Sequence, residues 1–227
     1  LFSSKATQYG VIHKVETATQ NPENSRFSLL RYRCSQYAYT RIDEYARLPI
    51  KRSQYFHEKD IPVIGIDPSK EVAEYAIREK GIPTEILFFG EETSKALVDK
   101  YGKADLIIGN NVLAHVPNIN DFIKGLKSFL KPNGTITMEF PHLQRLVEEN
   151  QFDTIYHEHF SYFSFSVVRR IFASHGIKIF DVDELSTHGG SLRIYGCHKE
   201  NEKVIVTERV TNLLKRERDL GVESLDY

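Results

Sequence analysis

The central part of the chain alternates short apolar runs with longer segments in which apolar residues recur at helical spacing. The runs are typical of buried strands, and the periodic segments are typical of amphipathic helices. The predicted strands are residues 61–67, 84–89, 104–110 and 135–140. The predicted helices are residues 69–81, 92–102 and 119–130. Strands joined by helices of this length indicate right-handed crossovers and a parallel sheet, so the pattern predicts an α/β fold.

The pattern changes after residue 150. A helix is predicted for residues 164–176, followed by strands at 177–185 and 191–199 with the loop "STHGG" between them. We expect one of these strands to be antiparallel and to complete a seven-stranded sheet. A charged helix with an apolar stripe is predicted for residues 202–220.

Three parts of the chain follow from this pattern. Residues 1–55 form an N-terminal segment of uncertain fold, in which "YGVIHKVE" has the pattern of a strand but is not followed by a glycine-rich turn and a helix. The α/β domain covers residues 56–200. The last predicted helix occupies most of residues 201–227.

Composition narrows the class of protein. The 227 residues include 30 basic and 31 acidic side chains, a net charge of −1 that argues against a nucleic-acid partner. The longest apolar runs are too short to span a bilayer, and the first ten residues lack the features of a signal peptide. Two cysteines, Cys34 and Cys197, exclude a disulfide framework and a four-cysteine zinc site. We therefore expect a cytoplasmic protein that binds neither membrane nor nucleic acid.

Chemically useful side chains stand at the predicted strand ends, where an open α/β sheet binds its ligand. Asp67 ends the first of the four strands, and a carboxylate there can accept both hydroxyls of a ribose. Capping of the next helix explains Asp67 equally well. Phe88 and Phe89 end the second strand. One of them could lie against an adenine, although core packing is the default for phenylalanine.

The segment "GNNVLAHVPN" follows the third strand and contributes Asn110, Asn111 and His115. Asparagines at this position can hydrogen-bond a ligand or simply shape the turn.

The stretch "DTIYHEHFSYFS", residues 153–164, combines two histidines with a glutamate and several aromatic residues. It could form an acid/base site, a metal site or an aromatic patch of core. On a strand, His157 and His159 would point to the same side and could chelate a metal together with His142 or His188. Nothing in the spacing requires such a centre, and we predict no metal.

Four ordered segments resemble a known family: "GIDPSKEVA", "NNVLAHVPN", "YHEHFSYFS" and "THGGSLRIYG". Together they resemble the Rossmann-like S-adenosylmethionine-dependent methyltransferases, and more narrowly the enzymes that methylate a carbon of nucleotide-linked keto-deoxysugars. The resemblance covers about residues 55–227, with a fainter echo in "CSQYAYT". It implies a mostly parallel sheet with an antiparallel late strand and S-adenosylmethionine as cofactor. It also implies cofactor contacts from Asp67, Phe89, Asn110 and Asn111.

Some features of the family that the chain resembles are not visible in its sequence. The first strand with its glycine-containing acidic loop is not visible, because "ARLPIKRSQYFHEKD" stands directly before residue 61. An N-terminal zinc module with paired cysteines is not visible either. Residues 201–227 are expected to lead into a truncated second domain. A partner chain or a homo-oligomer is therefore compatible with the sequence.

Carbon methylation beside a ketone requires a base that removes a proton and leaves an enolate. Histidine suits this role because it titrates near neutral pH. A neighbouring carboxylate can fix its tautomer, and a tyrosine can hydrogen-bond the enolate oxygen. The resemblance favours His159 as the base, with Tyr156 and Glu158 around it and His115 facing the same cleft. His157 is expected mainly to support the structure.

We therefore predict an S-adenosylmethionine-dependent C-methyltransferase that acts on a nucleotide-linked keto-deoxysugar or a similar small carbonyl substrate. A NAD-dependent sugar enzyme would require G-x-G-x-x-G after its first strand, and the chain contains none. The alternative from another class is a non-catalytic remnant or one subunit of a split methyltransferase. Binding of S-adenosylmethionine separates these two hypotheses.

Overall fold

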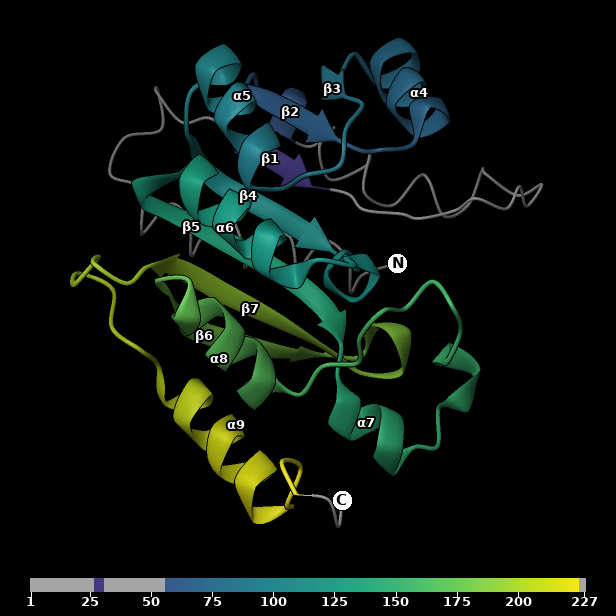
Figure 1. Ribbon diagram of the computed structural model, residues 1–227, viewed down its shortest axis with the longest axis vertical. Helices are drawn as coiled ribbons and strands as arrows, with labels where there is room; N and C mark the ends of the chain where they lie inside the picture. The colour runs from purple at the N-terminus through teal and green to yellow at the C-terminus, as the bar shows by residue number, and fades with distance from the viewer. Residues whose placement is uncertain (1–26, 31–55, 225–227) are drawn as a thin grey trace.

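A computed structural model describes residues 27–30 and 56–224 (Figure 1). Within these residues, seven strands form one sheet in the order β3-β2-β1-β4-β5-β7-β6. Strand β7 is antiparallel to both of its neighbours, whereas the other adjacent pairs are parallel. The predicted mostly parallel sheet with an antiparallel late strand is therefore confirmed.

The described elements have the following bounds. The strands are β1 (Phe27–Leu30), β2 (Val63–Ile66), β3 (Thr84–Glu85), β4 (Ala104–Asn110), β5 (Leu130–Pro141), β6 (Ile177–Leu185) and β7 (Ser191–His198). The helices are α4 (Lys70–Lys80), α5 (Glu91–Tyr101), α6 (Ile119–Phe129), α7 (Leu143–Glu148), α8 (Phe165–Ser174) and α9 (Glu208–Asp219). Short 3-10 helices are η2 (Leu113–His115), η3 (Phe152–Thr154) and η4 (Thr187–Gly189).

Strand β1 lies within residues 1–55, the segment of uncertain fold in which the first strand of the family is not visible from the sequence. It lies between β2 and β4, with Phe27 opposite both Val63 and Leu106. Its four residues are too few to show a period, and no glycine-rich turn marks its end. The predicted strand "YGVIHKVE" and the segment between β1 and residue 56 lie outside the described residues.

Two predicted elements end or begin elsewhere, and the histidine-rich stretch does not have the geometry that a metal chelate would need. Among the described strands, β3 pairs with β2 alone and ends at Glu85. Residues 86–89 form a loop. Helix α9 begins at Glu208, since Lys178 and the carbonyl of Phe180 on β6 bind the backbone of the preceding residues 201–207. The histidine-rich stretch is a series of turns after η3 and not a strand.

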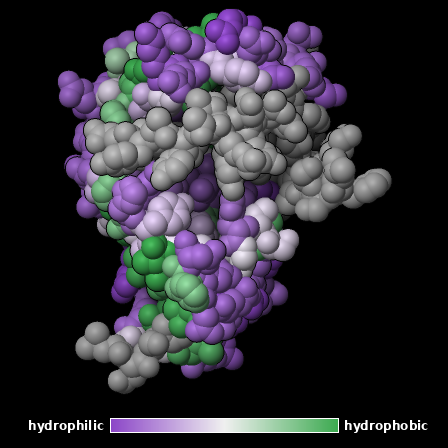
Figure 2. Space-filling view, turned by 90° about the vertical axis from the view of Figure 1, so that its right-hand side faces the viewer, coloured by the Kyte–Doolittle hydropathy of each residue, from purple (hydrophilic) through white to green (hydrophobic). Residues whose placement is uncertain are grey.

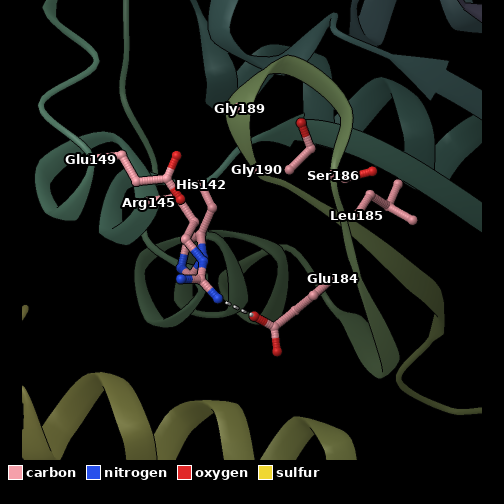
Figure 3. Close-up of a pocket in the computed structure, with 9 residues that line it drawn as sticks. His142, Arg145, Glu149, Glu184, Leu185, Ser186, Gly189 and Gly190 are labelled. Carbon is pink, nitrogen blue, oxygen red and sulfur yellow. Dashed lines mark ion pairs between the residues drawn. The ribbon is translucent and has the colours of Figure 1, made fainter.

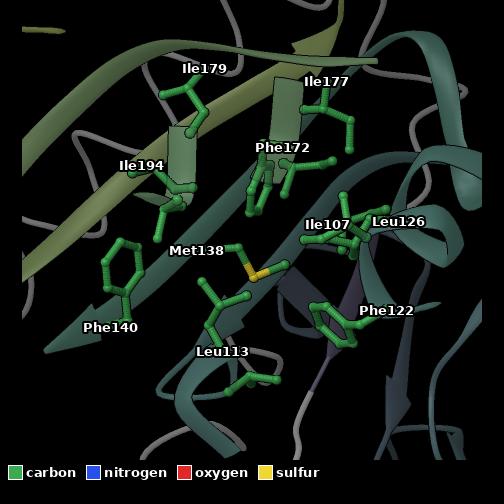
Figure 4. Packing of buried hydrophobic residues seen from close by; sticks show 14 of the residues in the cluster. Ile107, Leu113, Phe122, Leu126, Met138, Phe140, Phe172, Ile177, Ile179 and Ile194 are labelled. Carbon is green, nitrogen blue, oxygen red and sulfur yellow. The ribbon is translucent and has the colours of Figure 1, made fainter. Parts of the chain in front are cut away.

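Two apolar clusters cover the two faces of the sheet. Successive residues of β4 alternate between them: Leu106 and Ile108 belong to the cluster under α4, and Ile107 belongs to the larger cluster under α5, α6 and α8. Figure 4 shows the larger cluster, with Ile107 beside Phe122 and Leu126 of α6. Among the described helices, none is both long and apolar enough to cross a membrane.

Candidate functional site

The candidate site lies where β2, β4 and β5 end and the chain leaves the sheet. The "histidine turn", defined here as residues 154–160, begins at the last residue of η3. The backbone N–H of His159 donates to the carbonyl of Tyr156 at 3.0 Å and closes the turn. The ring of His159 lies 4.3 Å from that of Tyr156 and 4.7 Å from that of His115, between centroids. The structure thus brings together the side chains of His159, Tyr156 and His115, three of the four residues predicted for catalysis.

The hydrogen bonds of His159 define which ring nitrogen is basic. Its Nδ1 lies 2.8 Å from the carbonyl oxygen of Thr154. A carbonyl only accepts, so Nδ1 carries the proton and Nε2 of the neutral ring is an acceptor. The hydroxyl of Tyr156 lies 3.2 Å from Nε2 and donates to it. The tautomer-fixing position that we expected Glu158 to fill is taken by the carbonyl of Thr154.

Two hydrogen bonds attach the histidine turn to η2. The Nδ1–H of His115 donates to the backbone carbonyl of Glu158 at 2.9 Å, and the N–H of Phe160 donates to the carbonyl of Ala114 at 2.8 Å. His115 is 4 % exposed, so its ring forms a wall behind His159. Glu158 therefore contributes to this site through its backbone. His157 occupies an exposed position on the turn.

Several apolar side chains on and beside the histidine turn are exposed. Figure 2 shows the side of the molecule on which the strands end, with a hydrophobic patch in its lower half among mostly hydrophilic residues. Exposed apolar side chains on or beside the histidine turn are Phe152, Ile155, Tyr156 and Phe160. Exposed apolar patches of this kind mark surfaces that bind another molecule.

Asp67 directly follows β2 and is 3 % exposed. Its Oδ1 accepts a hydrogen bond from the N–H of Ser69 at 2.8 Å, so the carboxylate stabilises the turn into α4. Its own N–H donates to the carbonyl of Glu85 on the neighbouring strand. Ser69 is the N-cap residue of α4, so Asp67 closes the turn before the helix and does not cap it. The carboxylate stays at the edge of the sheet where a ligand would lie.

The two asparagines after β4 differ. Asn110 is the last residue of the strand and pairs with Glu139 of β5. Asn111 has a left-handed backbone (φ 53°) and donates its N–H to the carbonyl of Glu139. Its side-chain Oδ1 is buried and has no hydrogen-bond partner among the described residues. A buried acceptor of this kind indicates a missing donor, because such groups are normally paired.

Phe89 does not lie where a cofactor base could stack on it. It is 5 % exposed, and its ring packs against Phe122 and Phe129 of α6 at centroid distances of 5.6 and 6.0 Å. Because β3 ends at Glu85, Phe89 lies in a loop and not on a strand, and its side chain packs into the core. Phe88 beside it is 57 % exposed.

Sequence reasoning missed a buried ion pair beneath the site. Glu139 on β5 and Arg193 on β7 lie opposite one another, 2.6 Å apart and both about 5 % exposed. Thr187 in the glycine-rich loop also donates to Glu139, at 3.0 Å. The pair thus joins the "THGG" loop to the strand end that holds Asn111. The sequence feature that could have indicated the ion pair is the single charged residue within each of the apolar runs "TITMEF" and "SLRIYG".

A cavity of about 500 Å³ lies beside this loop (Figure 3). Arg145 and Glu184 face one another across it, with 4.0 Å between their charged groups. The lining residues are His142, Arg145, Glu149, Glu184, Leu185, Ser186, Gly189, Gly190 and Ser191. His188 is exposed on η4 with a left-handed backbone (φ 52°).

The described part of the chain holds no group of three or more histidine, cysteine, aspartate or glutamate side chains placed to bind a metal. The strand geometry on which a His157–His159 chelate depended is not present. The Nε2 of His142, a suggested third ligand, lies 2.7 Å from Glu217.

Comparison with known proteins gives the family. A family model described as a methyltransferase domain matches residues 48–182, and one described as a C-methyltransferase C-terminal domain matches residues 186–227. The chain belongs to the methyltransferase family. The C-methyltransferase NovU of Streptomyces niveus is 34% identical over 169 residues, which are 74% of this chain and 40% of NovU. The predicted S-adenosylmethionine-dependent methyltransferase family is therefore confirmed.

Solved structures confirm the fold. The magnesium protoporphyrin IX methyltransferase of Synechocystis PCC 6803, with bound SAH, has a TM-score of 0.56 and 15% identity, covering 85% of this chain and 83% of that one. A SAM-dependent methyltransferase of Anabaena variabilis has a TM-score of 0.55 and 17% identity, covering 78% of each chain. The matched region of NovU is less than half of that protein, so this chain corresponds to part of its length.

Proposed function

We propose that this chain is the methyl-transferring domain of an S-adenosylmethionine-dependent C-methyltransferase, with His159 as the base. The substrate class we propose is a small ketone carried on a nucleotide-linked deoxysugar. The observation that carries the proposal is the arrangement of His159, whose Nδ1–H is held by Thr154 while Nε2 is left basic. The name of the relative NovU supports methylation at carbon.

The base acts on the carbon beside the substrate ketone. Nε2 of His159 takes the proton from that carbon, and the electron pair of the broken C–H bond forms the enolate. The imidazolium that results keeps its Nδ1–H bond to the Thr154 carbonyl. A positioned base of this kind contributes about 10²–10⁴-fold to the rate.

The other residues of the site hold the substrate and exclude water. The hydroxyl of Tyr156, which donates to Nε2 in the structure, can turn to donate to the enolate oxygen. His115 supports the ring of His159 from behind. The apolar side chains on and beside the histidine turn would be covered by bound substrate, which strengthens electrostatic interactions inside the site.

Two residues fit the cofactor by their chemistry. The buried Asp67 carboxylate can accept ribose hydroxyls, and the unpartnered Oδ1 of Asn111 can accept an N–H or O–H of the cofactor. When bound, S-adenosylmethionine supplies the methyl group from its sulfonium. The enolate carbon must approach that methyl group in line, so positioning of both ligands carries much of the rate enhancement.

Cofactor binding tests the proposal first. Calorimetric titration with S-adenosylmethionine and S-adenosylhomocysteine should show binding, and Asp67→Ala should weaken it by about 1.5–3 kcal/mol, typical of a lost charge-assisted hydrogen bond. Asp99→Ala, on the exposed side of α5, is the matched control and should bind normally. Absence of binding at millimolar cofactor would favour a non-catalytic remnant or a split enzyme.

Proton exchange tests the base directly. With a nucleotide-linked keto-deoxysugar in deuterated water, the protein should exchange the hydrogen beside the ketone. His159→Asn should stop this exchange and methyl transfer while cofactor affinity stays within about threefold. His175→Asn, at a partly exposed histidine after α8, should change neither, and chelators should have no effect. Exchange that persists in His159→Asn but stops in His157→Asn would reverse the two roles.

A further inference from the structure

A buried carboxylate on the last helix contacts two segments that flank the histidine turn. Glu217 on α9 has a fully buried side chain, and His142, between β5 and α7, is 1 % exposed. Oε1 of Glu217 lies 2.7 Å from Nε2 of His142. The two residues are 75 positions apart in the sequence, so the contact fastens α9 to the end of the central sheet.

The same carboxylate caps helix α8. It accepts hydrogen bonds from the N–H groups of Phe165 (2.7 Å) and Ser166 (2.8 Å), at the first two positions of that helix. These N–H groups have no partner within the helix, and the helix dipole favours a negative charge beside them. Because backbone N–H groups only donate, Glu217 accepts all three bonds and His142 donates through Nε2.

The charge on Glu217 is maintained by these bonds. Burial alone would raise the pKa of the Glu217 carboxyl, but the hydrogen bonds from His142, Ser166 and Phe165 together hold the pKa below its ordinary value. The group is therefore a carboxylate at neutral pH. An apolar or amide replacement would leave buried donors without an acceptor, which is costly.

The anchored positions lie next to the histidine turn. His142 forms a parallel bridge with Phe163, and the N–H of Leu143 donates to the carbonyl of Phe163 at 2.9 Å. Phe165, held by Glu217, follows two residues later. The chain after the turn is thus fixed from the sheet side by His142 and from the α9 side by Glu217, while Phe160 is fixed to η2.

We propose that Glu217 and His142 are positioning residues, which hold the chain at residues 163–166 so that His159 keeps its contacts with Thr154, Tyr156 and His115. The expected effect on catalysis rests on the proposed function, whereas the expected effect on the hydrogen bonds of His159 does not. Glu217 lies in the part of the chain that matches the C-methyltransferase C-terminal domain. The inference therefore makes that region responsible for ordering the proposed base.

The test follows the Nδ1–H proton of His159 by NMR on the 227-residue chain. Its bond to Thr154 should make exchange with water slow. Glu217→Gln and His142→Leu should accelerate that exchange at least tenfold, and His142→Gln, which keeps an N–H donor toward Glu217, should stay within threefold. The controls are Glu223→Gln, in an exposed ion pair with Arg170, and His175→Asn.

Near-UV circular dichroism shows which variants are folded. Unchanged exchange at His159 in a folded Glu217→Gln or His142→Leu protein would overturn the inference. If neither variant folds, native-state exchange in the unmodified protein decides. The inference requires the same urea dependence of hydrogen exchange at three groups: the amides of Phe165 and Ser166 and the ring N–H of His159. Different urea dependences would overturn the inference.

Activity separates this inference from the proposed function. In folded Glu217→Gln, kcat should fall at least tenfold with KM within threefold, because the base is displaced while the ligand-binding residues stay in place. If the unmodified protein transfers no methyl group, but the Nδ1–H of His159 exchanges slowly and the exchange accelerates in the variants, the proposed function is refuted and the positioning role stands. Full activity in Glu217→Gln would refute the positioning role alone.

Discussion

Helices α6 and α9 pack on the same face of the sheet but are attached by different forces. Helix α6 buries an unbroken apolar stripe, and each of its core residues Phe122, Ile123, Leu126 and Phe129 is at most 1 % exposed. Helix α9 buries two apolar residues, Val210 and Leu213. Leu214 adds a partly buried apolar contact, and charged side chains make further attachments.

Three levels of charged contacts fasten α9. Arg209 pairs with Asp181 and Asp183 on β6. Further along the helix, Arg216 pairs with Glu184 and Glu217 binds His142, and the last of these contacts is completely buried. Apolar burial is largely insensitive to pH and salt near neutrality, whereas ion pairs depend on protonation and screening. Helix α9, whose Glu217 contacts the segments beside the histidine turn, is therefore held to a larger extent by the more conditional interactions.

Removing an aromatic ring from α6 should have the largest effect. Phe122→Ala leaves a cavity against Phe89 and should reduce the free energy of unfolding by about 3–5 kcal/mol, measured by urea denaturation. The loss should be the same at pH 5 and pH 8. Ile77→Ala, at an exposed position of α4, is the control and should change stability by less than about 0.5 kcal/mol. A loss below about 1 kcal/mol for Phe122→Ala would contradict the comparison.

Glu217→Gln should be almost as costly at neutral pH, about 3 kcal/mol, because it breaks a buried pair and leaves donors unsatisfied. This loss should depend on pH. The pKa of Glu217 is lowered in the folded state, so its stabilisation is complete above about pH 4.3, the ordinary glutamate value, and disappears as pH falls through the lowered value.

The measurement is a set of urea titrations from pH 7 down to pH 3. The difference in stability between the unmodified protein and Glu217→Gln should shrink at the acid end. Glu223→Gln should stay close to the unmodified protein throughout. A difference that grows toward low pH would mean that the folded state binds protons at this group more readily than the unfolded chain.

The same contrast explains how much the sequence could predict. Helix α6 was predicted to within one residue, because its stability comes from a local apolar period that the sequence displays. Strand β1 was missed, since four residues without a clear alternation acquire their strand geometry from β2 and β4 on either side. Helix α9 was predicted to begin too early because contacts with β6 hold its preceding residues outside the helix.

The candidate site shows the same division. Residue types at strand ends indicated Asp67 and Asn111 as candidates, and the resemblance of "YHEH" to the family motif favoured His159 as the proposed base. The sequence could not show that the backbone carbonyl of Thr154 orients the base, because every residue has a backbone carbonyl and its identity does not reveal the contact. The partner of His142 was equally hidden, since a glutamate in a charged helix ordinarily faces solvent.

The smallest expected effect concerns Arg216, which makes two hydrogen bonds to Glu184 of 2.7 and 3.0 Å on a partly exposed surface. This bond to Arg216, more than any other contact, holds the pKa of Glu184 below its ordinary value. Solvent screens the pair, so Arg216→Met should cost only about 0.2–1 kcal/mol at low salt. At 1 M NaCl the screening length is about 3 Å, and most of this loss should vanish.

Urea titrations at low and high salt measure the effect, with Arg218→Met on the exposed side of α9 as the matched control. Phe122→Ala should keep its full loss at both salt concentrations, because it removes apolar packing. A loss in Arg216→Met that persists unchanged in 1 M NaCl would show that the aliphatic part of the arginine, and not its charge, fastens this level of the helix. Arg216 would then attach α9 by apolar packing, as the core residues attach α6, and the attachment at Glu217 would still depend on charge.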